Sequence, residues 1–191
     1  MARYEKGHKD ETRQRILEVA ARQFRERGVA AAGLAGIMAE AGLTNGAFYV
    51  HFESKEDLIR TVLDDALARR EEVWRSLAAG EGGVTAMIGE YLSARHRDHP
   101  GGGCPTAAMV AEIAREPAAT RRIFTGRIKA IVARIAAWMT GPTAEQREAD
   151  ALAIYALMVG ALQLARAVDD NALSDRILAS AAATARKLAG G

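Results

Sequence analysis

Residues 41–58 of the chain read AGLTNGAFYVHFESKEDL. Gly42 permits a sharp turn, because glycine adopts positive φ angles at little cost, and Leu43 is placed to fill the angle between the segments that meet there. Thr44 can cap the segment that follows, and Ser54, followed by acidic residues, can cap a longer helix. The stretch therefore predicts two short helices joined by a glycine-containing turn, which is a helix-turn-helix, with a long helix directly after it.

The aromatic residues of segment 45–52 divide between two roles. Phe48 and Phe52 are apolar rings four residues apart, which predicts that both anchor the segment on one buried face. Tyr49 and His51 have polar tips, so we expect a phenol and an imidazole to face outward. The residues that precede them are small or polar, which lets the backbone approach a binding partner closely.

Almost every other segment has helical periodicity, and none shows a sustained alternation of apolar and polar residues. Glycine and proline clusters separate these segments. The predicted fold class is therefore all-α, with about nine helices. The expected helices cover residues 10–28, 34–41, 45–51, 54–77, 84–97, 106–115, 117–139, 144–168 and 174–188.

The stretch 41–58 resembles the DNA-binding segment of the tetracycline-repressor (TetR) family of bacterial transcriptional regulators. The similarity lies in the Ala-Gly-Leu-Thr turn at 41–44, the Phe-Tyr-Val-His-Phe segment at 48–52 and the Ser-Lys-Glu-Asp-Leu helix start at 54–58. It extends over roughly residues 10–60. One departure is that Ala32 and Gly33 stand where family members usually carry serine or threonine as the cap and phosphate contact of the preceding helix.

The second half resembles a subset of the family more loosely, through residues 91–98 and 103–112. The resemblance implies a variable ligand-binding and dimerising domain, and it does not name the ligand. We therefore expect an N-terminal three-helix, helix-turn-helix DNA-binding domain at 1–53 and a larger helical ligand-binding and dimerisation domain at 54–191.

Residues of three kinds are expected to contact double-stranded DNA. The second helix of a helix-turn-helix, here expected at 45–51, is the recognition helix, and its N-terminal end reaches base edges in such modules. Tyr49, His51 and Lys55 suit the phosphate backbone, and the basic residues that open the first helix supply local positive charge. The predicted DNA contacts are Thr44, Asn45, Gly46, Ala47, Tyr49, His51, Lys55 and Arg13.

Composition sets the background for this interpretation. The 191 residues carry 26 Lys and Arg against 24 Asp and Glu, so the formal charge of +2 does not by itself indicate nucleic-acid binding, and any positive surface must be local. The polar N-terminus lacks the apolar core of a signal peptide. The uncharged stretch 151–165 is shorter than the roughly 20 residues that span a bilayer. We expect a cytoplasmic protein without a membrane partner.

The apolar faces of the C-terminal helices supply both core and ligand pocket. Methionine and aromatic side chains suit apolar or aromatic ligands, and the predicted lining is Met87, Tyr91, Cys104, Met109, Phe124, Ile128, Trp138, Tyr155 and Met158. Cys104 is the single cysteine, and it is either a small buried residue at a helix start or an electrophile or redox sensor. His96 and His99 lie near it, but the spacing fits no standard zinc pattern, so neither a metal nor a cofactor is expected.

Segment 151–165 is apolar nearly all round, which indicates burial on several sides and predicts a homodimer through the last two helices. Gly160 and Ala161 allow close approach of a partner helix, and the last helix adds Ile177, Leu178, Ala181, Ala182 and Ala185. The expected function is a homodimeric repressor that a small-molecule ligand releases from a palindromic operator. The alternatives are a ligand-independent activator and a helical small-molecule binding protein or enzyme, but no catalytic constellation stands out.

Overall fold

Ten α-helices and one short 3₁₀ helix make up the described part of the chain, residues 2–80 and 82–190 of a computed structural model, and no β-strand occurs in that part. The all-α prediction is confirmed. The helices are α1 (Ala2–Arg27), α2 (Leu34–Glu40), α3 (Asn45–Phe48), α4 (Lys55–Ala78), α5 (Gly83–Tyr91), α6 (Ala94–Asp98), the 3₁₀ helix η1 (Pro100–Gly102), α7 (Pro105–Ile113), α8 (Ala118–Trp138), α9 (Ala144–Ala167) and α10 (Asn171–Leu188).

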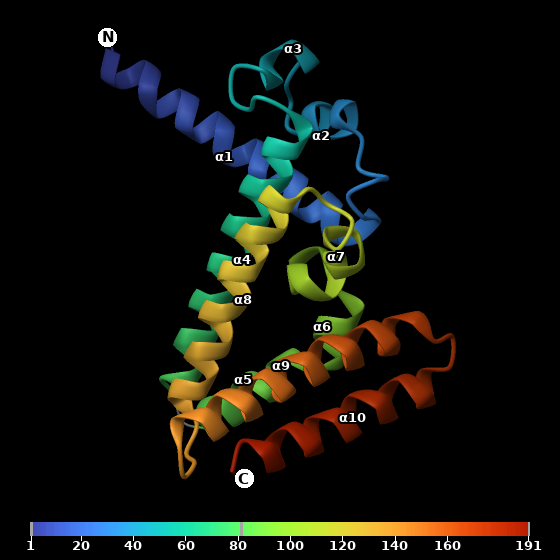
Figure 1. Ribbon diagram of the computed structural model, residues 1–191. Helices are drawn as coiled ribbons and strands as arrows, with labels where there is room; N and C mark the ends of the chain where they lie inside the picture. Colours follow the sequence, from blue (N-terminus) through green and yellow to red (C-terminus); the bar gives the residue numbers. More distant parts are fainter. Residues whose placement is uncertain (1, 81, 191) are drawn as a thin grey trace.

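Figure 1 shows two parts of unequal size. The helices α1, α2 and α3 form the smaller part, which we call the head, and α5–α10 form the larger part, the body. Helix α4 begins at the head and runs down along α8, with which it packs, while α9 and α10 lie side by side across the far end of the body. One helix therefore belongs to both parts.

Hydrogen bonds from side chains to the backbone cap the starts of four helices, α4, α6, α9 and α10. Ser54 Oγ accepts the Asp57 N–H at 3.1 Å, Thr143 Oγ1 accepts the Gln146 N–H at 3.1 Å, and Asp170 caps α10. Ser93 adds a cap that the periodicity did not reveal, because its Oγ accepts the His96 N–H at 3.1 Å. The single helix expected at 84–97 is thus wrong, and the segment forms α5 and α6.

Three other predicted boundaries differ from the structure by three residues or more, and one is the start of α10, which lies at Asn171 rather than residue 174. Helix α1 begins at Ala2 rather than near residue 10, since residues 2–9 contain no proline and Gly7 inside a helix costs only about 1 kcal/mol. Helix α3 ends at Phe48 rather than residue 51. The chain continues there as hydrogen-bonded turns, with the Phe52 N–H on the Phe48 carbonyl at 3.0 Å.

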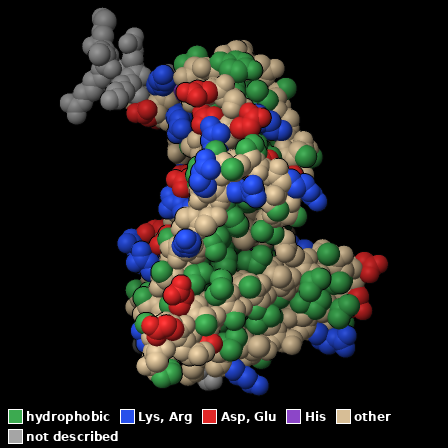
Figure 2. Space-filling view, in the orientation of Figure 1, with side chains coloured by type: hydrophobic (Ala, Val, Ile, Leu, Met, Phe, Trp, Pro, Cys, Tyr) green, Lys and Arg blue, Asp and Glu red, His purple; other side chains and the backbone are tan. Residues whose placement is uncertain are grey.

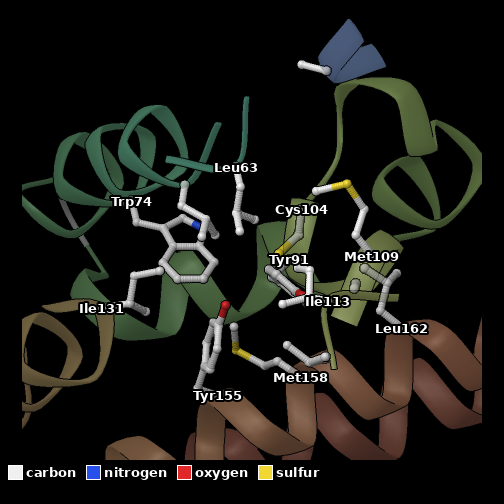
Figure 3. Close-up of a cluster of buried hydrophobic side chains, with 14 of the residues drawn as sticks. Leu63, Trp74, Tyr91, Cys104, Met109, Ile113, Ile131, Tyr155, Met158 and Leu162 are labelled. Carbon is white, nitrogen blue, oxygen red and sulfur yellow. The ribbon is translucent and has the colours of Figure 1, made fainter. Parts of the chain in front are cut away.

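The interior of the body is built from side chains that α4, α5, α7, α8 and α9 supply (Figure 3). The Trp74 ring lies 5.6 Å from that of Tyr91 and 6.0 Å from that of Tyr155, centroid to centroid. Tyr155 shares a 2.7 Å hydrogen bond with the hydroxyl of Thr106. Burial of each such side chain stabilises the fold by about 1.5–3 kcal/mol, so these rings fix how the four helices meet.

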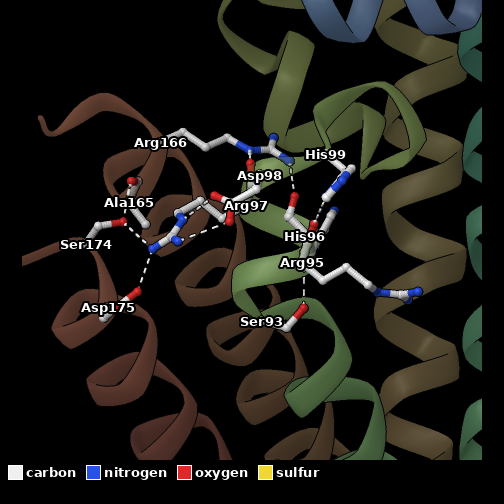
Figure 4. Close-up of polar contacts among 10 residues, drawn as sticks. All are labelled: Ser93, Arg95, His96, Arg97, Asp98, His99, Ala165, Arg166, Ser174 and Asp175. Atoms are coloured by element: carbon white, nitrogen blue, oxygen red, sulfur yellow. Dashed lines mark hydrogen bonds and ion pairs between the residues drawn. The ribbon is translucent and has the colours of Figure 1, made fainter. Parts of the chain in front are cut away.

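A polar junction ties α6 to the last two helices (Figure 4). The guanidinium of Arg166 on α9 donates to the His96 carbonyl at 2.6 Å, and Arg97 donates to Asp175 on α10 at 2.6 Å. The buried His96 ring contacts the Tyr91 carbonyl through Nδ1 and accepts the Cys104 N–H through Nε2 at 2.9 Å. Burial lowers the pKa of His96 to about 4, so the ring is neutral at physiological pH.

Helix α9 is long and apolar enough, by length and composition, to cross a membrane. In this structure it packs against α7, α8 and α10, and Ile154, Met158 and Leu162 are fully buried. Core helices of soluble proteins share this composition, so α9 is only weak support for a membrane span.

Candidate nucleic-acid interface

The turn between α2 and α3 has the predicted geometry. Gly42 has a φ of +70°, in the left-handed region that favours glycine. The Leu43 N–H donates to the Met38 carbonyl at 2.9 Å, and the Gly42 N–H donates to the Ala39 carbonyl at 3.0 Å, which closes the end of α2. Leu43 is half-buried against the core. The helix-turn-helix prediction is confirmed.

Helix α3 and the turns after it separate apolar rings from outward-facing ones. Phe48 is fully buried and stacks on Phe52 at 5.5 Å between centroids. Tyr49 meets the Phe48 ring edge-on at 5.2 Å, and 71% of its surface is exposed. Val50 beside it is 60% exposed. Two large side chains thus project from the head into solvent, on a base that the buried phenylalanines hold rigid.

The predicted base-contacting residues lie at the exposed start of α3. Thr44, Asn45 and Gly46 are all exposed, and Ala47 is half-buried. Thr44 occupies the N-cap position with φ −81° and ψ 156°, but its side chain makes no capping hydrogen bond. The Thr44 hydroxyl therefore does not cap α3, although the sequence predicted that it would. An exposed hydroxyl at a helix start is available to a nucleic acid.

Arg13 and His51 lie near the end of the segment that contains Phe52. The Arg13 guanidinium sits 4.9 Å above the Phe52 ring, a cation–π contact that fixes α1 against the end of residues 45–52, which we call the recognition segment. His51 is half-buried, and its Nδ1 has no hydrogen-bond partner among the described residues. Burial, followed by the nearby cations Lys9 and Arg13, lowers the pKa of His51, which disfavours the charged imidazolium.

Lys55 is the first residue of α4 and faces the loop between α1 and α2. Its Nζ donates to the Val29 carbonyl at 3.1 Å. An ammonium group has three N–H donors, so this contact leaves two for a phosphate. The structure thus brings Lys55 to the head as predicted, already held by a backbone contact.

A contact that sequence reasoning missed joins the body to the same loop. The Glu112 carboxylate on α7 accepts the N–H groups of Val29 and Ala30, both at 3.0 Å. Gly28 has a φ of +83°, and a Cβ there would lie 3.1 Å from Glu112 Oε2. The position of Glu112 within the second-half motif was its only sequence signal, and nothing local shows that it reaches residues 29 and 30.

Gly33 caps α2 without a side chain, as the departure from the family pattern implied. It has φ −72° and ψ 141°, an ordinary cap conformation, and a Cβ there would meet no atom within 4 Å. We expect Gly33→Ser to raise the free energy of unfolding by about 0.5 kcal/mol, since the hydroxyl accepts an otherwise unpaired N–H of α2. Urea denaturation measures this change. Gly33→Ala is the control, and equal stability of the two variants would contradict a capping effect.

The residues expected to line a ligand pocket do not all come together. Six of them are buried in the body: Met87, Tyr91, Cys104, Met109, Tyr155 and Met158. Phe124, Ile128 and Trp138 are half-buried on α8 and pack against that core. Four grooves among the described residues lie elsewhere, along α1 and α4, beside α6, between α9 and α10, and beneath the α1–α2 loop.

No group of three His, Cys, Asp or Glu side chains in the described part of the chain is placed to hold a metal ion. Cys104 is buried, and its backbone N–H is bound to the ring of His96. The contact between these two residues is thus a hydrogen bond that positions the start of α7.

Comparison with known proteins gives the same assignment for the head. Residues 16–62 match the family model for bacterial regulatory proteins of the tetR family. Over 78 residues the chain is 45% identical to the HTH-type transcriptional regulator TtgR of Pseudomonas putida, covering 38% of this chain and 37% of that protein. Over 68 residues it is 41% identical to the HTH-type transcriptional repressor BepR of Brucella suis, covering 36% and 32%. The matched region spans about a third of these relatives.

Solved structures extend the similarity to the whole fold. A TetR transcriptional regulator from Chloroflexus aurantiacus superposes with a TM-score of 0.76 at 26% identity, covering 94% of this chain and 96% of that one. The body as well as the head therefore has the helical arrangement of that regulator. The relatives and structural neighbours named above are regulators rather than enzymes.

Proposed function

We propose that this chain, whose N-terminal segment belongs to the TetR family and whose overall fold is that of solved members, is a DNA-binding transcriptional regulator. The observation that carries the proposal is the recognition segment, where Tyr49 projects into solvent beside exposed Thr44 and Asn45 on a rigid phenylalanine base. Such a segment fits a major groove. The cytoplasm, where DNA is accessible, is the proposed location.

The proposed DNA contacts divide into two groups. Thr44, Asn45 and Gly46 read base edges, where Asn45 could pair bidentately with adenine, and Ala47 lets the backbone approach. Tyr49, His51, Lys55 and Arg13 bind phosphates and fix the register. The pKa of His51 is lowered, so Lys55 and Arg13 are the side chains that supply the positive charge facing the phosphates, while His51 can donate a hydrogen bond.

We assign the DNA-binding domain to residues 1–53 and the ligand-binding and dimerisation domain to 54–191. Helix α4 starts at Lys55 and connects the two domains, since its first turn lies at the head and its Trp74 is buried in the core of the body. The bond between Glu112 and the α1–α2 loop is a second connection. A ligand that moves α7 or the far end of α4 would reach the head by these two routes.

A homodimer through α9 and α10 is supported by an uncovered apolar face. A groove of about 580 Å³ runs between the two helices, lined by Leu157, Gly160, Leu164 and Ile177 among others, and we call it the α9–α10 groove. Leu164 is 59% exposed, and a Cβ at Gly160 would meet no atom within 4 Å. Figure 2 shows hydrophobic side chains gathered over this end of the molecule.

Part of the predicted dimer surface has another role. Leu178, Ala182 and Ala185 are buried within this chain, where they pack α10 against its neighbours. The residues left to a partner are therefore those of the groove. A two-fold dimer built on it would carry two recognition segments, and a palindromic operator with half-sites about 34 Å apart would suit them.

The salt dependence of DNA binding tests the proposed function. Lys55 and Arg13 in two subunits make four cationic phosphate contacts, so the slope of log K against log salt is expected near about −3.6. The probe is a duplex that the protein itself enriches from a random-sequence library, titrated by fluorescence anisotropy from 50 to about 300 mM salt. Lys55→Gln should reduce the slope by about 2, since it removes two contacts. A flat response in the unaltered protein would favour a helical small-molecule binding protein instead.

A further inference from the structure

A groove lies where α1 of the head meets α4 and the loop after α6. It has a volume of about 590 Å³, and we call it the α1–α4 groove. Volumes of about 300–1,000 Å³ are typical of small-molecule sites. Four arginines line it, Arg22 and Arg25 from α1 and Arg69 and Arg70 from α4, against two carboxylates, Glu18 and Asp65. The side chains that line it thus carry a net positive charge.

Three of the four arginines are already neutralised. Arg69 Nε lies 2.8 Å from Asp65, and Arg70 makes two hydrogen bonds to Glu90, the shorter at 2.8 Å. Arg22 is paired with Glu40 and lies 3.7 Å from Glu26. Because these three guanidinium groups are already paired with carboxylates, they do not offer a strong site for an added anion.

Arg25 differs from the other three. Its Nε donates to the carbonyl of Gly101 at 2.6 Å, and no carboxylate in the described part of the chain lies within 4 Å of its nitrogens. Burial lowers the pKa of Arg25, which reflects the cost of holding its charge away from water. The bond to Gly101 uses one of five N–H donors, so the planar Nη edge retains donors that match a carboxylate or sulfonate.

The uncharged side chains that line the groove are apolar. Val19 on α1, and Ala66 and Val73 on α4, line it, and Val73 is 46% exposed. A ligand that suits both features has one acidic group and an apolar body. The α9–α10 groove is of similar size, but Arg176 is the single charged residue in its lining.

We propose that the α1–α4 groove binds a small organic anion, whose acidic group pairs with Arg25 and whose apolar part lies on Val19, Ala66 and Val73. Such a ligand touches the head through α1 and the body through α4 and Gly101. The ligand would therefore lie between the head and the body. Any effect of the ligand on DNA binding rests on the proposed function, whereas binding of the ligand itself does not.

The test compares a fluorescent anion with its uncharged analogue. The anion is 8-anilinonaphthalene-1-sulfonate, and the analogue is N-phenyl-1-naphthylamine, which lacks the sulfonate. Arg25→Gln is expected to weaken binding of the anion at least tenfold and to leave that of the analogue unchanged. Arg176→Gln, in the α9–α10 groove, should change neither. Unchanged anion binding in Arg25→Gln, equal weakening of both probes, or loss in Arg176→Gln would each overturn the proposal.

A second pair of variants leaves Arg25 in place. Val73→Asp puts a negative charge at an exposed position in the groove, and Val73→Asn adds a similar side chain without charge. The first should weaken anion binding at least tenfold and the second less than twofold, while equal effects would overturn the proposal. Binding of the enriched duplex by the unaltered protein is measured in parallel. If the unaltered protein did not bind the duplex, the proposed function would be refuted but the proposed anion site would not, since the anion experiment does not involve DNA.

Discussion

Tyr49→Ala is expected to weaken binding to the enriched operator duplex at least 100-fold while the fold and oligomeric state stay unchanged. The Tyr49 side chain is 71% exposed, and its ring meets that of Phe48 in a T-shaped contact, so the head loses little packing without it. A hydrogen bond to a charged phosphate contributes about 1.5–3 kcal/mol. A dimer loses two such bonds, and 1.4 kcal/mol corresponds to a factor of ten, which gives the expected loss.

Anisotropy titrations at fixed salt measure this change, with circular dichroism and sedimentation as checks on fold and assembly. Tyr49→Phe keeps the ring and removes the hydroxyl, so its affinity should fall between those of the unaltered protein and Tyr49→Ala. Thr125→Ala is the matched surface control, because that hydroxyl bonds to the Arg121 carbonyl of its own helix. An affinity for Tyr49→Ala within threefold of the unaltered protein would refute the assignment of the recognition segment.

Leu164→Lys is expected to convert the proposed dimer to a monomer and to weaken binding of the enriched duplex by more than 100-fold. Leu164 lies in the α9–α10 groove and is 59% exposed. A two-fold interface would bury two unpaired ammonium groups there, and each costs several kcal/mol. Lysine is preferred to glutamate because Arg176 lines the same groove and would pair with a carboxylate. A monomer holds one half-site and loses the gain in effective concentration that linkage provides.

Sedimentation equilibrium at micromolar concentration measures the assembly, and anisotropy measures the affinity. Leu152→Lys is the matched control, since Leu152 is also on α9 and 54% exposed but does not line the groove. It should remain a dimer with normal affinity. A dimeric Leu164→Lys would show that the subunits meet elsewhere, and a monomeric unaltered protein would refute the proposed dimer. Tyr49→Ala and Leu164→Lys together separate DNA contact from assembly, because only the second should change both.

The helix-turn-helix was predictable because its causes are local. Gly42 adopts the positive φ that its turn needs, and Ser54 caps α4 by accepting the N–H of Asp57, three residues further on. Phe48 and Phe52 are buried at the spacing that places them on one face. The exposure of Tyr49 followed from the same spacing. The errors were also local in origin, since the cap at Ser93 interrupts a segment whose apolar periodicity continues through it.

The sequence by itself thus determined an all-α chain, the recognition segment and the apolar character of α9, because turns, caps and helical faces depend on neighbours within a few residues. Only the tertiary structure decided which surfaces are joined and which remain open. Glu112 reaches the α1–α2 loop across 83 positions, and Arg25 reaches Gly101 across 76. The open groove between α9 and α10 likewise results from how the helices pack. Periodicity shows that a residue faces inward, whereas the neighbour it meets there is set by the packing of distant helices.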